Sequence, residues 1–205
     1  MNELTSLTGE PNEASQTSPP MHVKRRLGLL LALLLLITSG FGVWLYNNVI
    51  ANKPLQRVLS ADQRNTVVKA HAHFDGWLDV HTLVFNIDDV SGEARRADVL
   101  RVFLQYAQAM KEQRLKKVVL ACKGTRKFEM SGAYFKQLGS EYDTQNPIYT
   151  MRTLPLNVTA MDGSHPYSAY EGGIFAVLAK EMEQFGDFSD RWYGRDFFDL
   201  SGAGK

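Results

Sequence analysis

The sequence predicts a single N-terminal transmembrane helix followed by one small mixed-sheet domain of the α/β or α+β class. Two observations support this prediction. The segment from Leu27 to Tyr46 contains no charged residue and is rich in leucine, as a membrane-spanning helix requires. The chain after it alternates short β-branched runs with amphipathic helical patterns, in the order β-β-α-β-α-β-α.

The apolar segment is long enough to cross a bilayer, so we assign residues 27–48 to the transmembrane helix. Its 20 uncharged residues cover about 30 Å, the thickness of the hydrocarbon layer. The basic triplet 24–26 precedes the helix directly, whereas Lys53 and Arg57 follow it at a greater distance. Because basic residues favour the cytoplasmic side, we expect residues 1–26 to form a disordered cytoplasmic tail. The domain is then extracytoplasmic.

A cleaved signal peptide is the alternative to this signal-anchor. The hydrophobic region of a signal peptide usually has about 7–15 residues, and the segment found here is longer. No A-x-A-like cleavage site follows it, and its only stretch of small residues, 38–40, lies inside the apolar run. We therefore expect the helix to be retained in the mature protein.

Composition limits the possible partners. The chain carries 23 basic and 22 acidic residues, a formal charge of +1, so it has no general basic field for nucleic acid. Its single cysteine, Cys122, cannot form an internal disulfide or a cysteine-based metal site. We therefore expect no nucleic-acid partner.

We expect residues 49–64 to form a connector and residues 65–205 the extracytoplasmic domain. Pro54 opens a short helical pattern in the connector. The domain begins with two strand patterns, over 66–74 and 77–87. Asp75-Gly76 between them is typical of a two-residue hairpin turn, in which both central residues need positive φ.

The remaining elements follow from capping residues and apolar spacing. A helix capped by Ser91 is expected to run through Gln113, and a second helix is capped by Ser131. The predicted strands are 117–123, which has the unbroken apolar character of a fully buried strand, and 148–154, and the last helix covers about 171–185. Two β-α-β steps then imply three parallel strands with the first strand added antiparallel.

His71 and His73 are the most conspicuous candidate ligands. Two residues apart on a strand, they point to the same side and could share a metal. The predicted hairpin pairs them with Val80 and Leu78, and places the third histidine, His81, on the other face. We therefore favour a polar strand face over a metal site. A metal-assisted hydrolase using His71, His73 and a nearby acid, Asp75 or Asp79, stays the alternative function.

Other candidates have simpler structural interpretations. Asp88-Asp89 ends a strand, where ligands often bind, but acids also favour a helix start. Cys122 lies in the most apolar strand, where a thiol is usually inert. The basic loop containing Lys123, Arg126 and Lys127 could meet an anionic surface, and Gly172-Gly173 could expose N–H groups to an anion. No nucleophile elbow or phosphate loop occurs, and we assign no catalytic, cofactor-binding or metal-binding residue.

The segment 185–200 carries six aromatic residues interleaved with acids. Such residues either anchor a last helix on the core or form an interface. We slightly favour an interface for Trp192, because its charged neighbours would be costly to bury and two glycines interrupt the helix.

The function predicted from these observations is a non-catalytic binding or assembly module of the cell envelope. The lipid bilayer would be contacted through residues 27–48, and the domain would bind a protein partner or a second copy of itself. The expected location is a membrane, with the domain in the periplasm if the protein is bacterial.

Overall fold

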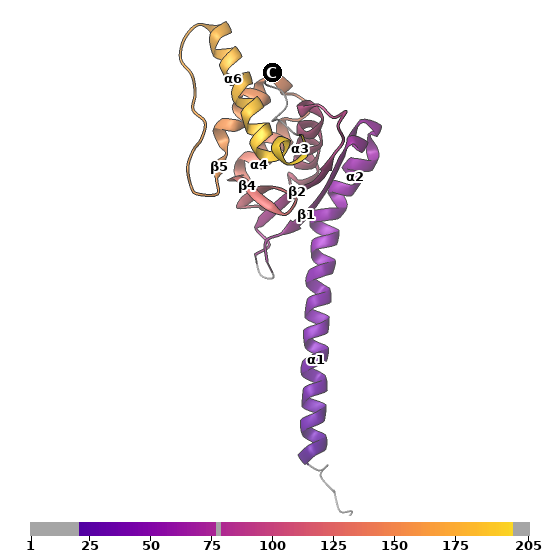
Figure 1. Cartoon of the computed structure of the whole chain (residues 1–205). Coiled ribbons are helices and arrows are strands. Elements are labelled where there is room, and N and C mark those ends of the chain that lie inside the picture. Colours follow the sequence, from indigo (N-terminus) through magenta and orange to yellow (C-terminus); the bar gives the residue numbers. More distant parts are fainter. Residues whose placement is uncertain (1–20, 77–78, 199–205) are drawn as a thin grey trace, which may run out of the picture. The chain divides into compact units, whose positions relative to one another are not determined.

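The computed structural model describes residues 21–76 and 79–198, and most of the predicted tail, residues 1–20, lies outside this range (Figure 1). The chain divides into two compact units, residues 1–42 and 43–205. Helix α1 spans Met21–Tyr46 and therefore includes the basic triplet that we assigned to the tail. Among the described residues, one helical stretch is long and apolar enough to cross a membrane, and it lies near the N-terminus.

The second unit is built on one five-stranded mixed sheet in the order β1-β2-β3-β4-β5. Strand β2 pairs parallel with β3, and every other neighbouring pair is antiparallel. The strands are β1 (Val68–Phe74), β2 (Thr82–Val90), β3 (Lys117–Cys122), β4 (Thr125–Ser131) and β5 (Thr159–Ala160). The mixed α/β class is thus confirmed for the described residues.

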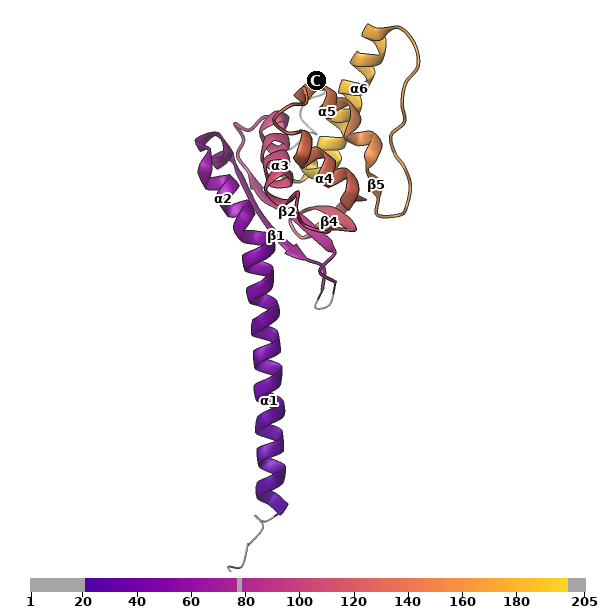
Figure 2. The ribbon, with the colours of Figure 1, turned by 180° about the vertical axis from the view of Figure 1, so that it is seen from behind.

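Helices and helical turns connect these strands. Helices α3 and α4 lie next to each other in both views of the ribbon (Figures 1 and 2). The elements are η1 (Asn47–Asn52), α2 (Lys53–Ala61), η2 (Gln63–Val67), α3 (Arg96–Met110), α4 (Gly132–Glu141), α5 (Pro147–Thr153), η3 (Pro155–Asn157), α6 (Ile174–Ser189), η4 (Asp190–Gly194) and α7 (Arg195–Phe197).

The predicted order of strands and helices is not confirmed, because the sheet contains one parallel step instead of two. Strand β3 turns directly into β4 through Lys123 and Gly124, both with positive φ (48° and 77°), which suits a tight hairpin. The predicted strand 148–154 is wrong, since most of it forms helix α5. Pro147 occupies its first turn, and the Asn146 side chain accepts a hydrogen bond from the N–H of Ile148 (2.9 Å).

The predicted two-residue hairpin is also wrong. Phe74 pairs with Leu83, so β2 begins at Thr82 and the connection is longer, and Trp77 and Leu78 within it lie outside the described residues. Before β2, Asp79 accepts from the N–H groups of His81 (2.9 Å) and Thr82 (3.1 Å). The pairing register of β1 with β2 therefore differs from the predicted one.

Helix α3 begins at Arg96, later than predicted, and Ser91 precedes it without capping it. The predicted cap of the next helix is confirmed, because Ser131 Oγ accepts from the N–H of Tyr134 at 3.1 Å.

Aromatic side chains fill the core between the sheet and the helices. Trp192 is 1% exposed, and its ring centroid lies 6.0 Å from that of Phe85 and 5.6 Å from those of Phe103 and Phe188. Its Nε1 donates to the carbonyl of Ala121 at 3.3 Å. Our preference for an interface role of Trp192 is therefore wrong. The π-helical turn η4 directs Trp192 inward while its charged neighbours stay partly exposed.

Polar side chains from the end of the predicted transmembrane helix and from the expected connector protect the free edge of β1. Asn47 and Asn52 accept from the N–H groups of Phe74 (2.5 Å) and Ala72 (3.2 Å), and Gln56 donates to the carbonyl of Ala70 (3.0 Å). The π-helical geometry of η1 aligns residues five apart, which brings both asparagines to the same strand. An unpaired strand edge invites association with another chain, and this edge is occupied.

Candidate functional site

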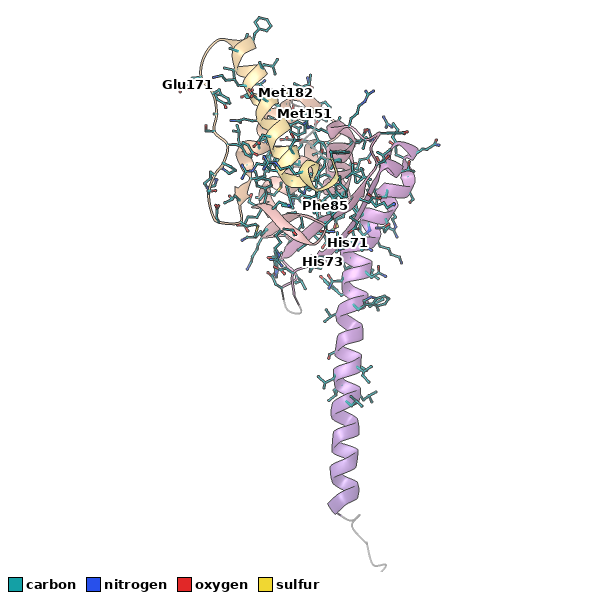
Figure 3. The ribbon with its side chains drawn as sticks, viewed as in Figure 1. His71, His73, Phe85, Met151, Glu171 and Met182 are labelled. Carbon is teal, nitrogen blue, oxygen red and sulfur yellow. The ribbon has the colours of Figure 1, made fainter. Side chains whose placement is uncertain are left out.

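The two histidines of β1 lie on the face of the sheet opposite the main core. Their rings stack with centroids 5.6 Å apart (Figure 3). His71 pairs across the sheet with Asn86 and His73 with Val84. The Nδ1 atom of His71 lies 2.7 Å from a carboxylate oxygen of Asp88. Asn86 donates to the other oxygen of Asp88 at 2.7 Å, so side-chain contacts hold the acid and the imidazole together.

The acids that we considered for a hydrolase are engaged elsewhere. Asp75 forms an ion pair with Arg126 (2.5 Å), and Asp79 is occupied by the turn before β2. Within residues 21–76 and 79–198, no three His, Cys, Asp or Glu side chains are grouped so that they could hold a metal ion. The structure therefore places His71 beside His73 on one side and Asp88 on the other, but it supplies no complete metal site in the described part of the chain.

The remaining sequence candidates have structural contacts. Burial raises the pKa of the Cys122 thiol to about 12, and a hydrogen bond with Asp196 acts in the same direction, so the thiol stays protonated. Lys123 donates to the carbonyl of Asp196 (2.6 Å), and Lys127 pairs with the Asp196 carboxylate (2.9 Å). Asp89 pairs with Lys69 (2.9 Å). The basic loop therefore holds the C-terminal segment.

A groove of about 580 Å³ opens where β2 ends and α3 begins. This volume lies in the range of about 300–1,000 Å³ typical of ligand sites. Its apolar part includes Met151 from α5 and Met182 and Phe185 from α6, and Met151 and Met182 lie near each other in Figure 3. Further apolar surface comes from Val90, Ala94, Ala97 and Phe198. The groove lining includes Arg95, Arg96, Met151, Met182, Phe185 and Tyr193.

Charged groups occupy one end of the groove. Arg96 donates to the Asp190 carboxylate through Nη2 (2.8 and 3.0 Å), so this pair is internally compensated. The Arg95 side chain is exposed and forms no ion pair with any residue that the structure describes. The Asp98 carboxylate lies at the same helix start, where it accepts from the N–H of Arg95 at 2.7 Å and interacts with the Arg95 charge. The groove therefore combines an apolar floor with charges that are compensated within the domain.

Sequence reasoning found only the surroundings of this groove. Asp88-Asp89 marks the carboxyl end of β2, but Met151 lies in the predicted strand 148–154, and the predicted last helix, about 171–185, gave no sign that Met182 lines a groove. The available signal was the position of Arg95 and Arg96 directly before an amphipathic helix, at the end of a strand that starts a β-α-β unit.

Comparisons with known proteins give no further guidance to the site. No protein-family model matches the sequence, no curated protein is significantly similar to it, and no solved structure significantly matches the fold.

Proposed function

We propose that the chain is a single-pass membrane protein whose domain is a non-catalytic binding or assembly module of the cell envelope. The apolar N-terminal helix supports anchoring in a bilayer. The basic residues before it support a cytoplasmic N-terminus and an extracytoplasmic domain. The groove at the start of α3 is the proposed binding site.

The contrast between the groove and the titratable groups carries this proposal. The acids Asp75, Asp79 and Asp89 all contact a partner within the domain, and the Cys122 thiol is buried. The groove, in comparison, is open and has the size of a ligand site. A binding role uses the open feature, whereas a catalytic role would require the engaged groups to be released.

Photo-crosslinking in intact membranes tests this function. A photoreactive amino acid replaces Met182 in the groove, and the matched control carries it at Lys136, an exposed position on α4. We expect a discrete crosslinked product from position 182 and none from position 136. Equal labelling from both positions, or no product from either, would contradict a binding role for the groove.

A further inference from the structure

The start of helix α6 is an uncharged and exposed part of the domain. Residues 174–179 are all apolar, and Lys180 is the first charged residue after them. Ile174 is 75% exposed and Phe175 85% exposed, the two largest values among the large hydrophobic residues that the structure describes. In both ribbon views this end of α6 stands clear of the sheet (Figures 1 and 2). A helix that is apolar on all sides is normally buried, so a cover from outside the domain is expected here.

Phe175 lies on the face of α6 that lines the groove. Met182 and Gly186, both in the groove lining, follow Phe175 by seven and eleven residues, which is close to two and three whole turns of a helix. They therefore lie about 10 Å and about 16 Å further along the helix. One face of a single helix thus presents an exposed apolar side chain and an open groove at a short distance from each other.

The groove suits an uncharged occupant. Arg96 forms an ion pair with Asp190 (2.8 Å), and Asp98 accepts from the N–H of Arg95 (2.7 Å), so the charged end of the groove has partners within the domain. The flexible side chains of the two methionines in the lining adapt to different apolar groups. An apolar segment without charges can therefore enter the groove without leaving a charge buried and unpaired.

Two copies of the chain can satisfy both features at once. In a contact with two-fold symmetry each chain uses the same surface, so Phe175 of each copy meets the groove of the other. The two α6 helices then run antiparallel. The symmetry axis passes near Ala179, which is midway in sequence between Phe175 and the groove residues Met182 and Gly186. Ala179 is small and exposed, so the two helices can approach closely.

The contact area is sufficient for a specific dimer. At about 200 Å² for each side chain, the exposed fractions of Ile174 and Phe175 leave about 300 Å² uncovered on each chain. Covering them with an equal area of the groove and its rim would bury about 1,200 Å² in a symmetric pair, which reaches the size of specific interfaces. The proposed anchor also holds every copy in one bilayer, which raises the effective concentration. Lipid would cover the start of α6 but would not account for the groove.

We propose that the groove is the docking site for the start of α6 of a second copy of this chain. Phe175 of each copy enters the groove of the other beside Met151 and Met182. The result is a dimer with two identical contacts, related by an axis near Ala179. This inference rests on the proposed binding function and names the partner of the same groove.

Crosslinking of the full chain in membranes tests the position of the axis. Ala179→Cys places a thiol where the two copies meet, and the matched control, Lys136→Cys, carries it at an exposed position on α4. A short bis-maleimide joins two nearby thiols. The native Cys122 is buried and its thiol stays protonated, so it does not react. We expect a product of twice the chain mass from Ala179→Cys, and none from Lys136→Cys or the wild type.

Energy transfer between two labelled populations of the full chain in lipid vesicles measures the dimer affinity. Phe175→Ala is expected to weaken dimerisation about thirtyfold, as loss of a central aromatic anchor does. Val80→Ala is the matched control. It removes apolar surface at an exposed position before β2, outside the groove lining, and leaves the affinity unchanged.

A mixture of two charged variants tests the symmetry. Phe175→Glu and Met182→Lys each disturb both contacts of their own dimer. When the two variants are mixed, one contact brings the opposite charges together and the other retains wild-type Phe175 and Met182. We therefore expect the mixed pair to form about tenfold more tightly than either variant pairs with itself. Thermal melting of each variant, followed by circular dichroism, confirms that it is folded.

The outcomes separate the proposal from its alternatives. Absence of dimers in the wild type, unchanged affinity in Phe175→Ala, or a mixed pair no tighter than the separate variants overturns it. Quenching of a fluorophore on Ala179→Cys by brominated lipid, with no dimer present, also overturns it, in favour of a bilayer as the cover of α6. If the chain does not dimerise while position 182 crosslinks to a different protein, only the partner is wrong; if both fail, the binding function is wrong as well.

Discussion

At the scale of single residues, the structure separates side chains that organise the domain from those that are open to a partner. Trp192 joins the sheet to the helices because it contacts Phe85, Phe103 and Phe188 and also bonds to the backbone of β3. Phe175 has a similar apolar character but is almost fully exposed. We therefore expect replacement of Trp192 and of Phe175 to have different effects on the stability of the domain.

Replacing Trp192 with alanine is expected to lower the free energy of unfolding by about 3–5 kcal/mol, because it removes buried aromatic contacts and leaves a cavity. Phe175→Ala is the matched control and is expected to change stability by less than about 0.5 kcal/mol, as exposed positions do. Urea unfolding of the full chain in detergent micelles, followed by circular dichroism, measures both. Similar stability of the two variants would show that Trp192 does not support the core.

His73 gives a pH-dependent forecast. Burial is the main cause that lowers the pKa of His73, and the positive charge of His71 adds to it. The unfolded chain then takes up a proton more readily than the folded one. The contribution of His73 to stability is present above the unfolded pKa of about 6.5 and is lost as the pH falls below it.

We therefore expect His73→Gln to reduce the fall in melting temperature between pH 7.5 and pH 5. These two pH values lie on either side of the usual histidine pKa of about 6.5. Measuring wild type and variant at both pH values separates this effect from any constant change in stability. An identical pH dependence in the two proteins would contradict it.

At the scale of elements, the sequence predicts the strands and helices that depend on local signals such as alternation, apolar runs and capping residues. The predicted strands 66–74 and 117–123 correspond to β1 (Val68–Phe74) and β3 (Lys117–Cys122), and the predicted Ser131 cap is present. Strand β4 was missed because Thr125–Ser131 is largely polar, with Phe128 and Met130 as its buried residues. The segment 147–153 has β-branched and aromatic residues, which favour a strand. It forms a helix because Asn146 caps its start and Pro147 suits the first helical turn. The groove could not be predicted, because it is assembled from α3, α5 and the continuous segment α6–η4, which are distant from one another in sequence.

The packing of α3 against α4 depends on a glycine. A Cβ atom on Gly139 would lie 2.2 Å from the carbonyl oxygen of Ala107, far inside a normal contact. Gly139→Ala must therefore push the helices apart, and we expect a loss of about 1–3 kcal/mol, the usual cost of overpacking. Gly92→Ala is the control, since its added Cβ meets nothing within 4 Å. Chemical unfolding of both variants measures the difference, and equal stability would contradict the close approach of the helices.

At the scale of the whole molecule, the two units differ in the kind of side chain that they expose. Residues 43–205 contain a sheet, an aromatic core and charged surface side chains, as expected of a domain in water. The apolar helix before them exposes a row of leucines, including Leu34, Leu35 and Leu36. Such a row is stable when lipid surrounds it, since a helix satisfies its own backbone hydrogen bonds. The helix proposed as the anchor and the groove proposed as the binding site thus belong to separate parts of the chain.

The basic residues on the two sides of the apolar helix predict its orientation in a membrane. Basic residues 24–26 lie next to the apolar run, whereas Lys53 and Arg57 are further from it, so the N-terminus is expected to stay in the cytoplasm. A reporter fused after Lys205 should then be active outside the cytoplasm, and protease added to spheroplasts should digest the domain. Replacing the basic triplet with glutamine should give mixed orientation, because Lys53 and Arg57 then dominate the local charge. Replacing Lys111, Arg114 and Lys116, which are distant in sequence from the helix, is the matched control and should leave the orientation unchanged. Protection of the domain from protease in the wild type would reverse the assignment.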